Sequence, residues 1–198
     1  MTGTVDPRDD RAHWAIRYAE RGDEFGRAPS AWVVDRCLTL PSGATIVDLA
    51  GGTGRHAAPL ARSGRTVIVV DFVPRAVAAA MSRHERVRGV VADARALPLR
   101  DASVTAIVCV SFLDRSIFPA LIRAIAPGGA LVYETFTVPH LDVVGRGAAR
   151  GPRNVAYLLE AGEIARLVAP LEIQEHEEGL VVDDAGERYV ARVMAIKR

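Results

Sequence analysis

One short stretch, residues 45–56, constrains the fold of this chain more than any other. It reads TIVDLAGGTGRH, so an apolar run that carries an acid is followed by glycines and then by a segment rich in alanine and leucine. This order is typical of a strand, a tight loop and the start of a helix. Glycines let the backbone turn sharply and approach a ligand, and the free N–H groups of a helix start favour an anion. The stretch therefore predicts a loop that binds a small anionic ligand.

Apolar strands and helical segments alternate at short intervals along the rest of the chain. Continuous β-branched runs such as TVIVVD at 66–71 are typical of strands buried on both faces of a parallel sheet. The alternation predicts a doubly wound α/β fold, closed by an antiparallel hairpin. The further strands are expected at 87–92, 104–111, 130–136, 171–180 and 189–196, and the helices at 11–20, from 29, 55–63, 74–84, 117–126 and 160–168. The segment 137–154 shows no clear period and is predicted to be a long binding loop.

Composition limits the classes of partner. The 25 basic and 24 acidic residues give a formal net charge of +1, which does not favour nucleic acid. No apolar run has the length of a membrane span, and the N-terminus lacks the pattern of a leader, so we expect a cytoplasmic protein without membrane contact. Cys37 and Cys109 lack the spacing of a metal site, and no metal is predicted. The only lysine is Lys197.

The glycine loop fits more than one class of nucleotide site. Residues 52–57 match the dinucleotide fingerprint G-x-G-x-x-G/A, and an acid, Asp71, ends the next apolar run. An NAD(P)-binding Rossmann oxidoreductase is therefore one interpretation. The single lysine near the C-terminus excludes the short-chain enzymes that need a Tyr-x-x-x-Lys motif.

The same loop also resembles the first motif of class I S-adenosylmethionine (SAM) dependent methyltransferases, D-x-G-x-G-x-G after two apolar residues. Here it stands at 48–54, with Ala50 where the family usually has its first glycine. Three shorter blocks resemble the small-molecule methyltransferases related to tellurite-resistance proteins. They are Trp14 with Arg17, Tyr18 and Pro29-Ser30; Gly54-Arg55; and Asn154 with Tyr157-Leu158-Leu159 and Gly162-Glu163.

The resemblance implies a fold and its layout. It implies a Rossmann-like, seven-stranded, mostly parallel sheet with a terminal antiparallel hairpin, and a single SAM-binding domain over residues 1–198. Residues 11–40 would form lid helices over the cofactor, and residues 137–157 a loop that receives the methyl acceptor. The alternative for Trp14, Tyr18 and Trp32 is that they are the apolar faces of packing helices.

The resemblance also implies a cofactor site at the strand ends. Gly51, Gly52 and Gly54 would accept the methionine portion of SAM, Asp71 both ribose hydroxyls, and Asp93 with Ala94 the adenine edge. Asp48 would order the loop or meet the amino group through water, and Arg17 or Arg55 would bind the carboxylate. The remaining candidates are Ala50, Phe72 and Ser111. For Asp71 and Asp93 the alternative is an acid that caps the next turn.

Few residues suggest catalysis. Methyl transfer mainly demands alignment, so a general base matters only for a weakly acidic acceptor. His140 in the long loop is a candidate base, Tyr18 is a candidate for the acceptor pocket, and Arg153 could hold an anionic substrate. We expect a small-molecule acceptor, S-adenosylhomocysteine as product, and a monomer or homodimer. A non-catalytic SAM-binding regulatory protein remains open.

Overall fold

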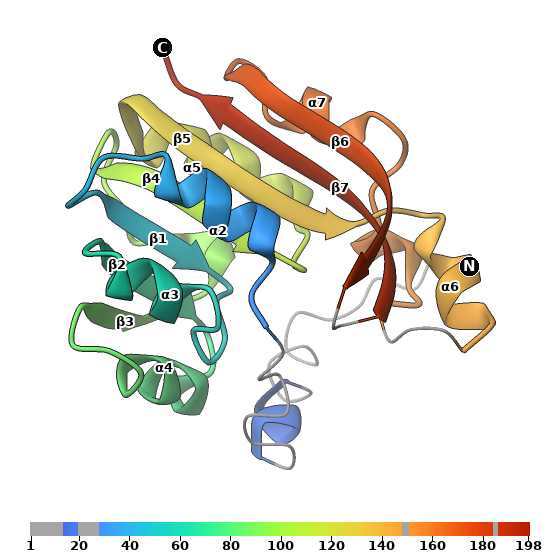
Figure 1. The fold of residues 1–198 in the computed structure, drawn as a ribbon, viewed down its shortest axis with the longest axis horizontal. Coiled ribbons are helices and arrows are strands. Elements are labelled where there is room, and N and C mark those ends of the chain that lie inside the picture. The colour runs from blue at the N-terminus through green and yellow to red at the C-terminus, as the bar shows by residue number, and fades with distance from the viewer. Residues whose placement is uncertain (1–13, 20–27, 148–150, 184–185) are drawn as a thin grey trace.

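A seven-stranded mixed sheet forms the centre of the computed structural model, which describes residues 14–19, 28–147, 151–183 and 186–198 (Figure 1). The strand order is β3-β2-β1-β4-β5-β7-β6. The strands are β1 (Thr45–Leu49), β2 (Thr66–Asp71), β3 (Val87–Val91), β4 (Val104–Val110), β5 (Ile125–Phe136), β6 (Glu172–Asp183) and β7 (Gly186–Ile196). The predicted doubly wound fold with its terminal hairpin is confirmed.

Five strands run parallel and the last two do not. β1 pairs in parallel with β2 and β4, β2 with β3, and β4 with β5. β7 then inserts antiparallel between β5 and β6. The chain builds the sheet outward from β1 in one direction through β2 and β3, and then in the other direction from β4. In such sheets ligands bind beyond the carboxyl ends of the strands at the point where the direction changes. The fold therefore places a ligand site beyond β1 and β4.

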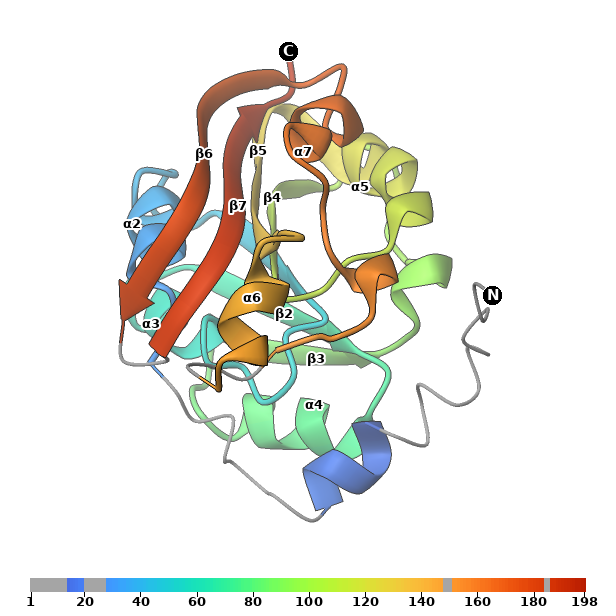
Figure 2. The same cartoon turned by 90° about the vertical axis from the view of Figure 1, so that its right-hand side faces the viewer.

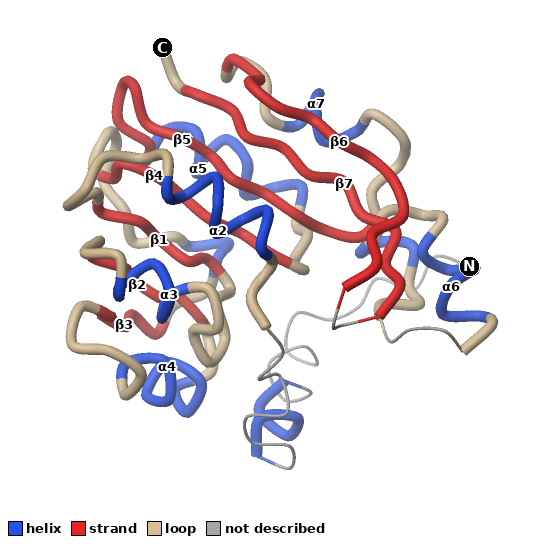
Figure 3. Tube along the Cα trace, viewed as in Figure 1, coloured by secondary structure: helices blue, strands red, loops and turns tan. Residues whose placement is uncertain are grey.

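Helices cover both faces of the sheet, which Figure 2 shows edge-on and Figure 3 shows as an alternation of strand and helix. α2 packs against β1, β4 and β5 on the same face as α3, whereas the buried residues of α5 and α7 belong to the core on the other face. The helices are α2 (Ala31–Leu38), α3 (Ala57–Arg62), α4 (Pro74–Met81), α5 (Phe118–Ala124), α6 (His140–Gly145) and α7 (Glu163–Leu167), with 3-10 turns η1 (Ala94–Ala96), η2 (Arg115–Ile117) and η3 (Val155–Tyr157).

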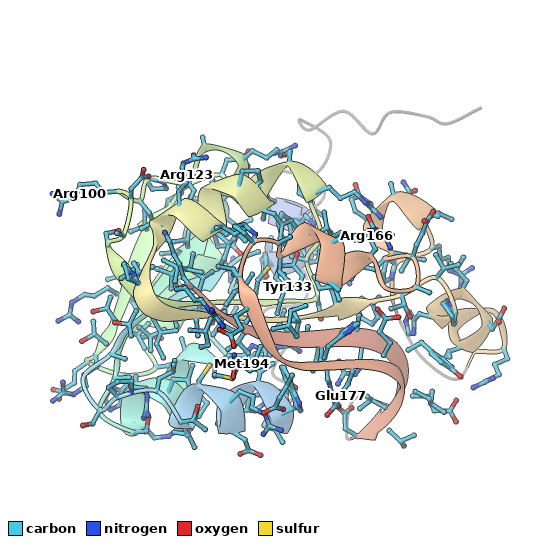
Figure 4. All side chains as sticks on the ribbon, turned by 90° about the horizontal axis from the view of Figure 1, so that it is seen from above. Arg100, Arg123, Tyr133, Arg166, Glu177 and Met194 are labelled. Atoms are coloured by element: carbon cyan, nitrogen blue, oxygen red, sulfur yellow. The ribbon has the colours of Figure 1, made fainter. Side chains whose placement is uncertain are left out.

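Apolar and aromatic side chains fill the interior, and charged side chains of both signs lie at the periphery, among them the labelled Arg100, Arg123 and Glu177 (Figure 4). Tyr133 of β5 is fully buried, packs on Phe118 with 5.2 Å between ring centroids, and donates a hydrogen bond to the carbonyl of Phe112. Arg123 lies at the surface. Lys197 donates to the carbonyls of Ile122, Arg123 and Ile125, which closes the C-terminal end of α5. The single lysine is thus a structural residue.

Two sequence-based expectations about element boundaries are corrected. β5 begins at Ile125, so the Pro-Gly-Gly segment at 127–129 is part of the strand, held to β7 by hydrogen bonds between Gly128 or Gly129 and Lys197. The predicted long loop contains α6, which Pro139 precedes at the N-cap and whose Val143 and Val144 are buried. Spacing at i and i+3 gives this helix an inward face, which a five-residue apolar pattern is too short to reveal.

The structure describes part of the expected lid over residues 11–40. α2 buries Trp32, Val33 and Cys37 against the sheet, so it is a covering helix, as the packing interpretation expects. Among the described residues of the expected lid, the short helical segment 14–19 lies against the glycine loop through Tyr18. The expected loose segment 1–10 and residues 11–13 and 20 of the expected helix 11–20 lie outside the described residues.

β6 is the last strand of the sheet and carries an acidic sequence. Glu172, Glu177 and Glu178 are exposed and Glu175 is half-buried. Alternation along the strand puts His176 and Glu178 on one face, where His176 Nε2 lies 3.1 Å from the Glu178 carboxylate. Among the described residues, no three potential ligating side chains form a metal site.

Candidate functional site

Strand topology brings three predicted acids to one edge of the sheet. Asp48 lies in β1, Asp71 ends β2, and Asp93 follows β3, which pairs Val91 with Asp71. Because β3, β2 and β1 are adjacent and parallel, their carboxyl ends point the same way. The acids therefore converge on the end of the sheet where the fold places a ligand.

The glycine loop between β1 and α3 has no room for side chains. A Cβ on Gly51 would lie 2.7 Å from Asp48 Cγ, and one on Gly54 would lie 2.8 Å from the Cβ of Ala80. Gly52 and Gly54 have φ values of +54° and +76°, which favour glycine. A Cβ on Gly52 would collide with the Tyr18 hydroxyl. The loop is therefore a backbone cradle of the kind that an anionic or polar ligand needs.

Asp48 is buried beneath this cradle. The side chain is 1% exposed, and its Oδ2 has no hydrogen-bond partner among the described residues. Burial raises the pKa of Asp48 to about 7, and the charge of Arg55 opposes the rise. A buried carboxyl oxygen without a donor is costly, and a ligand with an ammonium or N–H group would satisfy it.

Replacement of Asp48 by asparagine is expected to flatten the pH dependence of stability between about pH 4 and pH 7. With the folded pKa raised, the wild type in this window holds a proton that the unfolded chain has lost. Its free energy of unfolding therefore falls as pH rises, and the loss is complete above pH 7. Urea unfolding at a series of pH values measures the slope. Asp101→Asn, at an exposed carboxylate, is the control and should keep the slope of the wild type; a wild-type slope in Asp48→Asn would contradict the assignment.

Ala50 adopts a left-handed backbone conformation, with φ at +51°. This conformation costs an L-residue about 1–2 kcal/mol, which explains why the resembling family usually has glycine there. We expect Ala50→Gly to raise the free energy of unfolding by ~1 kcal/mol, since part of the relief is offset by backbone entropy. Ala58→Gly, inside α3, should instead lower it by ~1 kcal/mol. Denaturant unfolding measures both, and equal signs would contradict the prediction.

Asp71 and Asp93 already accept backbone hydrogen bonds. Asp71 accepts from Gly52 N and Val73 N, both at 2.9 Å, so it ties the glycine loop to the end of β2. Asp93 accepts from Arg95 N at 2.9 Å and pairs with the Arg95 guanidinium. The capping interpretation is thereby confirmed for both acids. Their contact with a ribose or an adenine stays a prediction, because carboxylate oxygens have lone pairs for further donors.

Residues 14–19 cover the glycine loop through Tyr18. Tyr18 is 8% exposed and packs with Val73 and Ala76, with Trp14 and Phe72 at the margin of the cluster. Burial raises the pKa of the Tyr18 hydroxyl, and the charge of Asp71 raises it further, so the group stays protonated. Tyr18 can therefore donate a hydrogen bond but cannot serve as the base. Arg17 lies over the Trp14 ring, 5.0 Å from its centroid.

A cavity of about 50 Å³ opens beyond β4 and β5. Its walls include Ser30, Arg55, Ser111, Glu134, Asp183 and Arg188. Ser111 has φ at +58°, and its N–H donates to the Glu134 carbonyl at 2.8 Å. A larger cavity of about 290 Å³ lies between Tyr18, Thr53 and one side of α4, and the three acids Asp48, Asp71 and Asp93 line neither cavity. The smaller cavity is the one at the strand ends, so we consider it the more relevant to chemistry.

Glu134 anchors a buried ion network that the sequence analysis missed. Glu134 is fully buried and accepts from Ser30 Oγ at 2.7 Å, Arg188 Nη1 at 2.9 Å and Arg192 Nε at 2.8 Å. Arg188 also pairs with Asp183. His56 accepts from Ser30 N at 3.1 Å, and burial lowers its pKa to about 3, so its ring is neutral. The signal in the sequence was an acid within an otherwise apolar strand, which requires a buried partner.

The two other predicted catalytic residues do not join this group. His140 starts α6 and is fully buried; its Nδ1 accepts from Tyr189 N at 3.3 Å, its ring packs on Phe136, and Gly151 lies directly against its Nε2. The expectation of a loop histidine is therefore wrong. Arg153 is exposed. Among the residues that line the two cavities, neither His140 nor Arg153 occurs, so their catalytic role rests on the sequence alone.

Other polar residues near the acceptor segment have structural contacts. Arg115 donates to both carboxylate oxygens of Glu163 and to the carbonyls of Ala156 and Leu158. Asn154 caps η3 by accepting from Ala156 N at 3.0 Å. These bonds fasten residues 154–163 to the turn after β4, so this part of the acceptor segment is held in place by the core.

The family comparison concerns the region that carries the glycine loop. Residues 46–129 match a family model described as a methyltransferase domain. The match shows that this segment is similar to a methyltransferase domain. The match spans β1, the glycine loop, all three strand-end acids and Ser111, and the fold around the methyltransferase domain is of the class I type. The family resemblance of the glycine motif is thereby confirmed, and the strand order with β7 between β5 and β6 fits it.

Relatives of the methyltransferase domain share parts of the chain. A demethylmenaquinone methyltransferase of Clavibacter sepedonicus is 36% identical over 121 residues, which are 57% of this chain and 49% of that protein. The chain spans about half the length of the curated relatives that it matches first. A SAM-dependent methyltransferase of Methanosarcina mazei has the same fold, with a TM-score of 0.69 and 19% identity over 86% of this chain and 99% of that one. A TehB-like SAM-dependent methyltransferase of Corynebacterium glutamicum also has this fold. Its TM-score is 0.64 and its sequence identity 17%, over 96% of this chain and 100% of that one.

The methyltransferase domain implies SAM as its cofactor, and the loop fits this group. The backbone cradle at 51–54 leaves space where side chains would collide, and the orphaned Asp48 oxygen is an acceptor for an ammonium group. Arg55 and Arg17 offer cations for the methionine carboxylate. Within the described ranges, no helix has both the length and the apolar character needed to cross a bilayer.

Proposed function

We propose that this protein transfers a methyl group from SAM to a small-molecule acceptor. The observation that carries the proposal is the convergence of the glycine cradle with Asp48, Asp71 and Asp93 at one edge of the sheet within a methyltransferase domain. When bound, SAM supplies a sulfonium methyl, the carbon to which an acceptor atom forms its new bond as the bond to sulfur breaks.

The strand-end residues then have separate tasks. Asp71, fixed by Gly52 N and Val73 N, presents its free lone pairs to the ribose hydroxyls. Asp93 and the Ala94 backbone meet the adenine, and Phe72, half-buried beside Tyr18, packs on it. Arg55 holds the carboxylate, and Asp48 favours the amino group. Each polar contact pairs a donor with an acceptor, or a cation with an anion.

Catalysis on this arrangement depends on exclusion of water and on alignment. Tyr18 lies against Gly52 and is buried, so residues 14–19 close the glycine loop from solvent. An acceptor atom would have to be aligned with the methyl group, opposite the sulfur. No charge needs to be stabilised in an oxyanion hole, because an anionic or lone-pair nucleophile meets a cation. A fixed base is needed only for an acceptor that is protonated at neutral pH.

Calorimetric titration with SAM and with NAD(P) tests the proposal. SAM is expected to bind with a dissociation constant in the micromolar range, about −8 kcal/mol. Binding of NAD(P) without SAM would establish the oxidoreductase interpretation instead. SAM binding without any S-adenosylhomocysteine formed over a broad panel of small acceptors would favour a regulatory protein.

Asp71→Ala is expected to weaken SAM binding at least tenfold, by more than about 1.4 kcal/mol. The change removes the ribose acceptor and also the two bonds that order the glycine loop. Asp35→Ala, at an exposed position of α2, is the matched control and should bind SAM like the wild type. Calorimetry on the folded variants measures the affinity. Unchanged affinity in a folded Asp71→Ala protein would remove Asp71 from the site.

A further inference from the structure

A buried chain of three polar residues joins the glycine loop to β5, and methyl transfer itself does not require any of them. The backbone N–H of Ser30 donates to His56 Nε2 at 3.1 Å, and the Ser30 hydroxyl donates to Glu134 Oε2 at 2.7 Å. His56 is 2% exposed, Ser30 is 7% exposed and Glu134 is fully buried. Buried polar groups that are satisfied in this way hold the elements that carry them in one arrangement.

The bond between Ser30 and His56 defines the state of the imidazole ring. A backbone N–H can only donate, so His56 Nε2 is the unprotonated nitrogen and Nδ1 carries the proton. Burial, together with the charges of Arg55 and Arg188, lowers the pKa of His56 to about 3. The ring is therefore neutral at every pH above about 4, and the bond to Ser30 is retained there.

His56 lies where the glycine loop becomes a helix. Gly54 N donates to the Gly51 carbonyl at 2.9 Å, and Ala58 N donates to the Gly54 carbonyl at 3.0 Å, so the last turn of the loop runs directly into α3. His56 is the N-cap residue of α3, but its side chain makes no capping hydrogen bond. The ring reaches Ser30 instead, so it fastens the loop to the start of α2.

Two other side chains fasten the glycine loop before Gly54. Asp71 accepts from a backbone N–H of the loop, and Arg83 Nε donates to one of its backbone carbonyls. His56 supplies the attachment on the other side of Gly54. Arg55 leaves the backbone between Gly54 and His56, so the direction of its side chain depends on this last attachment.

The Ser30 end of the chain is held by charge. Glu134 accepts from Ser30 and also from Arg188 and Arg192, at 2.9 Å and 2.8 Å. The Ser30 hydroxyl also caps α2, whose inner face packs on the sheet. Ser30 is therefore tied to the body of the protein, and its N–H is a fixed point for His56.

We propose that His56 is a positioning residue for the cofactor. Its bond to the Ser30 N–H fixes the junction between the glycine loop and α3, and with it the direction of Arg55 toward the methionine carboxylate of SAM. The inference rests on the proposed function for the role of Arg55. His56 acts through the loop and not by contact with SAM, since only 2% of the residue is exposed.

Two substitutions separate the hydrogen bond of His56 from the volume of its ring. His56→Gln keeps a side-chain oxygen that can accept from the Ser30 N–H, whereas His56→Leu fills the space without an acceptor. We expect His56→Leu to weaken SAM binding about tenfold or more, and His56→Gln to stay within about threefold of the wild type. Calorimetry on the folded variants measures both affinities. Equal affinities in the two variants would overturn the proposal.

Thr105→Val is the matched control at the opposite end of the central strands. Thr105 Oγ1 accepts from the backbone N–H of Thr45 at 3.3 Å, at the start of β1, so this variant also removes a side-chain acceptor from a backbone donor. It should lower the stability but leave the affinity for SAM within about twofold of the wild type. A loss of affinity equal to that of His56→Leu would assign the effect to general loosening of the sheet and overturn the positioning role.

A double-mutant cycle tests the route through Arg55. Arg55→Gln should itself weaken SAM binding, and in this background His56→Leu should weaken it by less than about threefold further, because the cation that His56 directs is absent. A general loss of stability would instead act equally in both backgrounds. Additive effects of the two substitutions would therefore overturn the proposal.

Side-chain ¹⁵N NMR of the wild-type protein needs no variant to fold. His56 should appear as the neutral tautomer with the proton on Nδ1 from about pH 5 to pH 8. The tautomer with the proton on Nε2 would remove the bond to Ser30 and overturn the proposal. Failure of the wild-type protein to bind SAM in the calorimeter would instead remove the proposed function, and with it the role of Arg55, whatever tautomer the ring adopts.

Discussion

Glu134→Ala is expected to lower the free energy of unfolding by about 3–5 kcal/mol, the cost of removing one partner from a buried charge cluster. Arg188 and Arg192 have side chains only 8% and 13% exposed, so without Glu134 two guanidinium groups would share a buried space, and the Asp183 carboxylate that pairs with Arg188 is itself 36% exposed. Ser30 would lose its acceptor as well, at the N-cap of α2. The effect should therefore exceed that of a single lost hydrogen bond.

Glu177→Ala is the control for this effect. Glu177 also faces Arg192, but at 3.8 Å and with 56% of its side chain exposed. Exposed ion pairs contribute about 0–1 kcal/mol, so this variant should unfold almost like the wild type. Urea denaturation of both proteins gives the two differences. Equal and small effects of the two substitutions would contradict the prediction. They would mean that the desolvation cost of the buried Glu134 cluster cancels the stabilisation from its hydrogen bonds and ion pairs.

Gly51→Ala is expected to weaken SAM binding at least a hundredfold, about 2.8 kcal/mol. The added Cβ would lie 2.7 Å from Asp48 Cγ and 2.9 Å from the Asp48 carbonyl oxygen. The carbonyl belongs to the central strand and cannot retreat, so the glycine loop must shift away from β1. A shift of the cradle misplaces every N–H group that faces the ligand.

Gly145→Ala provides the comparison, because a Cβ at this position of α6 meets nothing within 4 Å and φ is not positive. Calorimetric affinity for SAM should be unchanged there. Thermal unfolding of both variants separates a local displacement of the loop from loss of the fold. A folded Gly51→Ala protein that binds SAM normally would show that the cofactor does not use this cradle.

The strands and the acids at their ends could be predicted because their causes are local. The runs at 66–71 and 104–111 are continuous and β-branched, and an acid after such a run is at the end of a strand whichever fold it enters. Parallel topology then gathers those ends without further information. The glycine motif, with its positive φ values at Gly52 and Gly54, was predictable for the same reason.

The Glu134 network could not be predicted from pattern alone, since its members lie far apart in the chain. Glu134 and Arg188 are 54 residues apart, and only the antiparallel insertion of β7 beside β5 brings them together. A clue was present in the acid that interrupts the apolar run of β5. The burial of His140 in a helix was not predicted either. The helix α6 is too short to show a helical period in the sequence, and the packing of Val143 and Val144 after Pro139 sets its position.

The acidic composition of β6 has a consequence for colloidal behaviour. The strand terminates the sheet, so one row of its peptide groups faces outward as a template for another extended chain. At neutral pH, electrostatic repulsion between the glutamates of β6 on different molecules disfavours such edge-to-edge pairing. Leu180 and Val182 on the same strand are already exposed, so a loss of this repulsion in strongly acidic buffers would favour intermolecular strand pairing and fibrous precipitation.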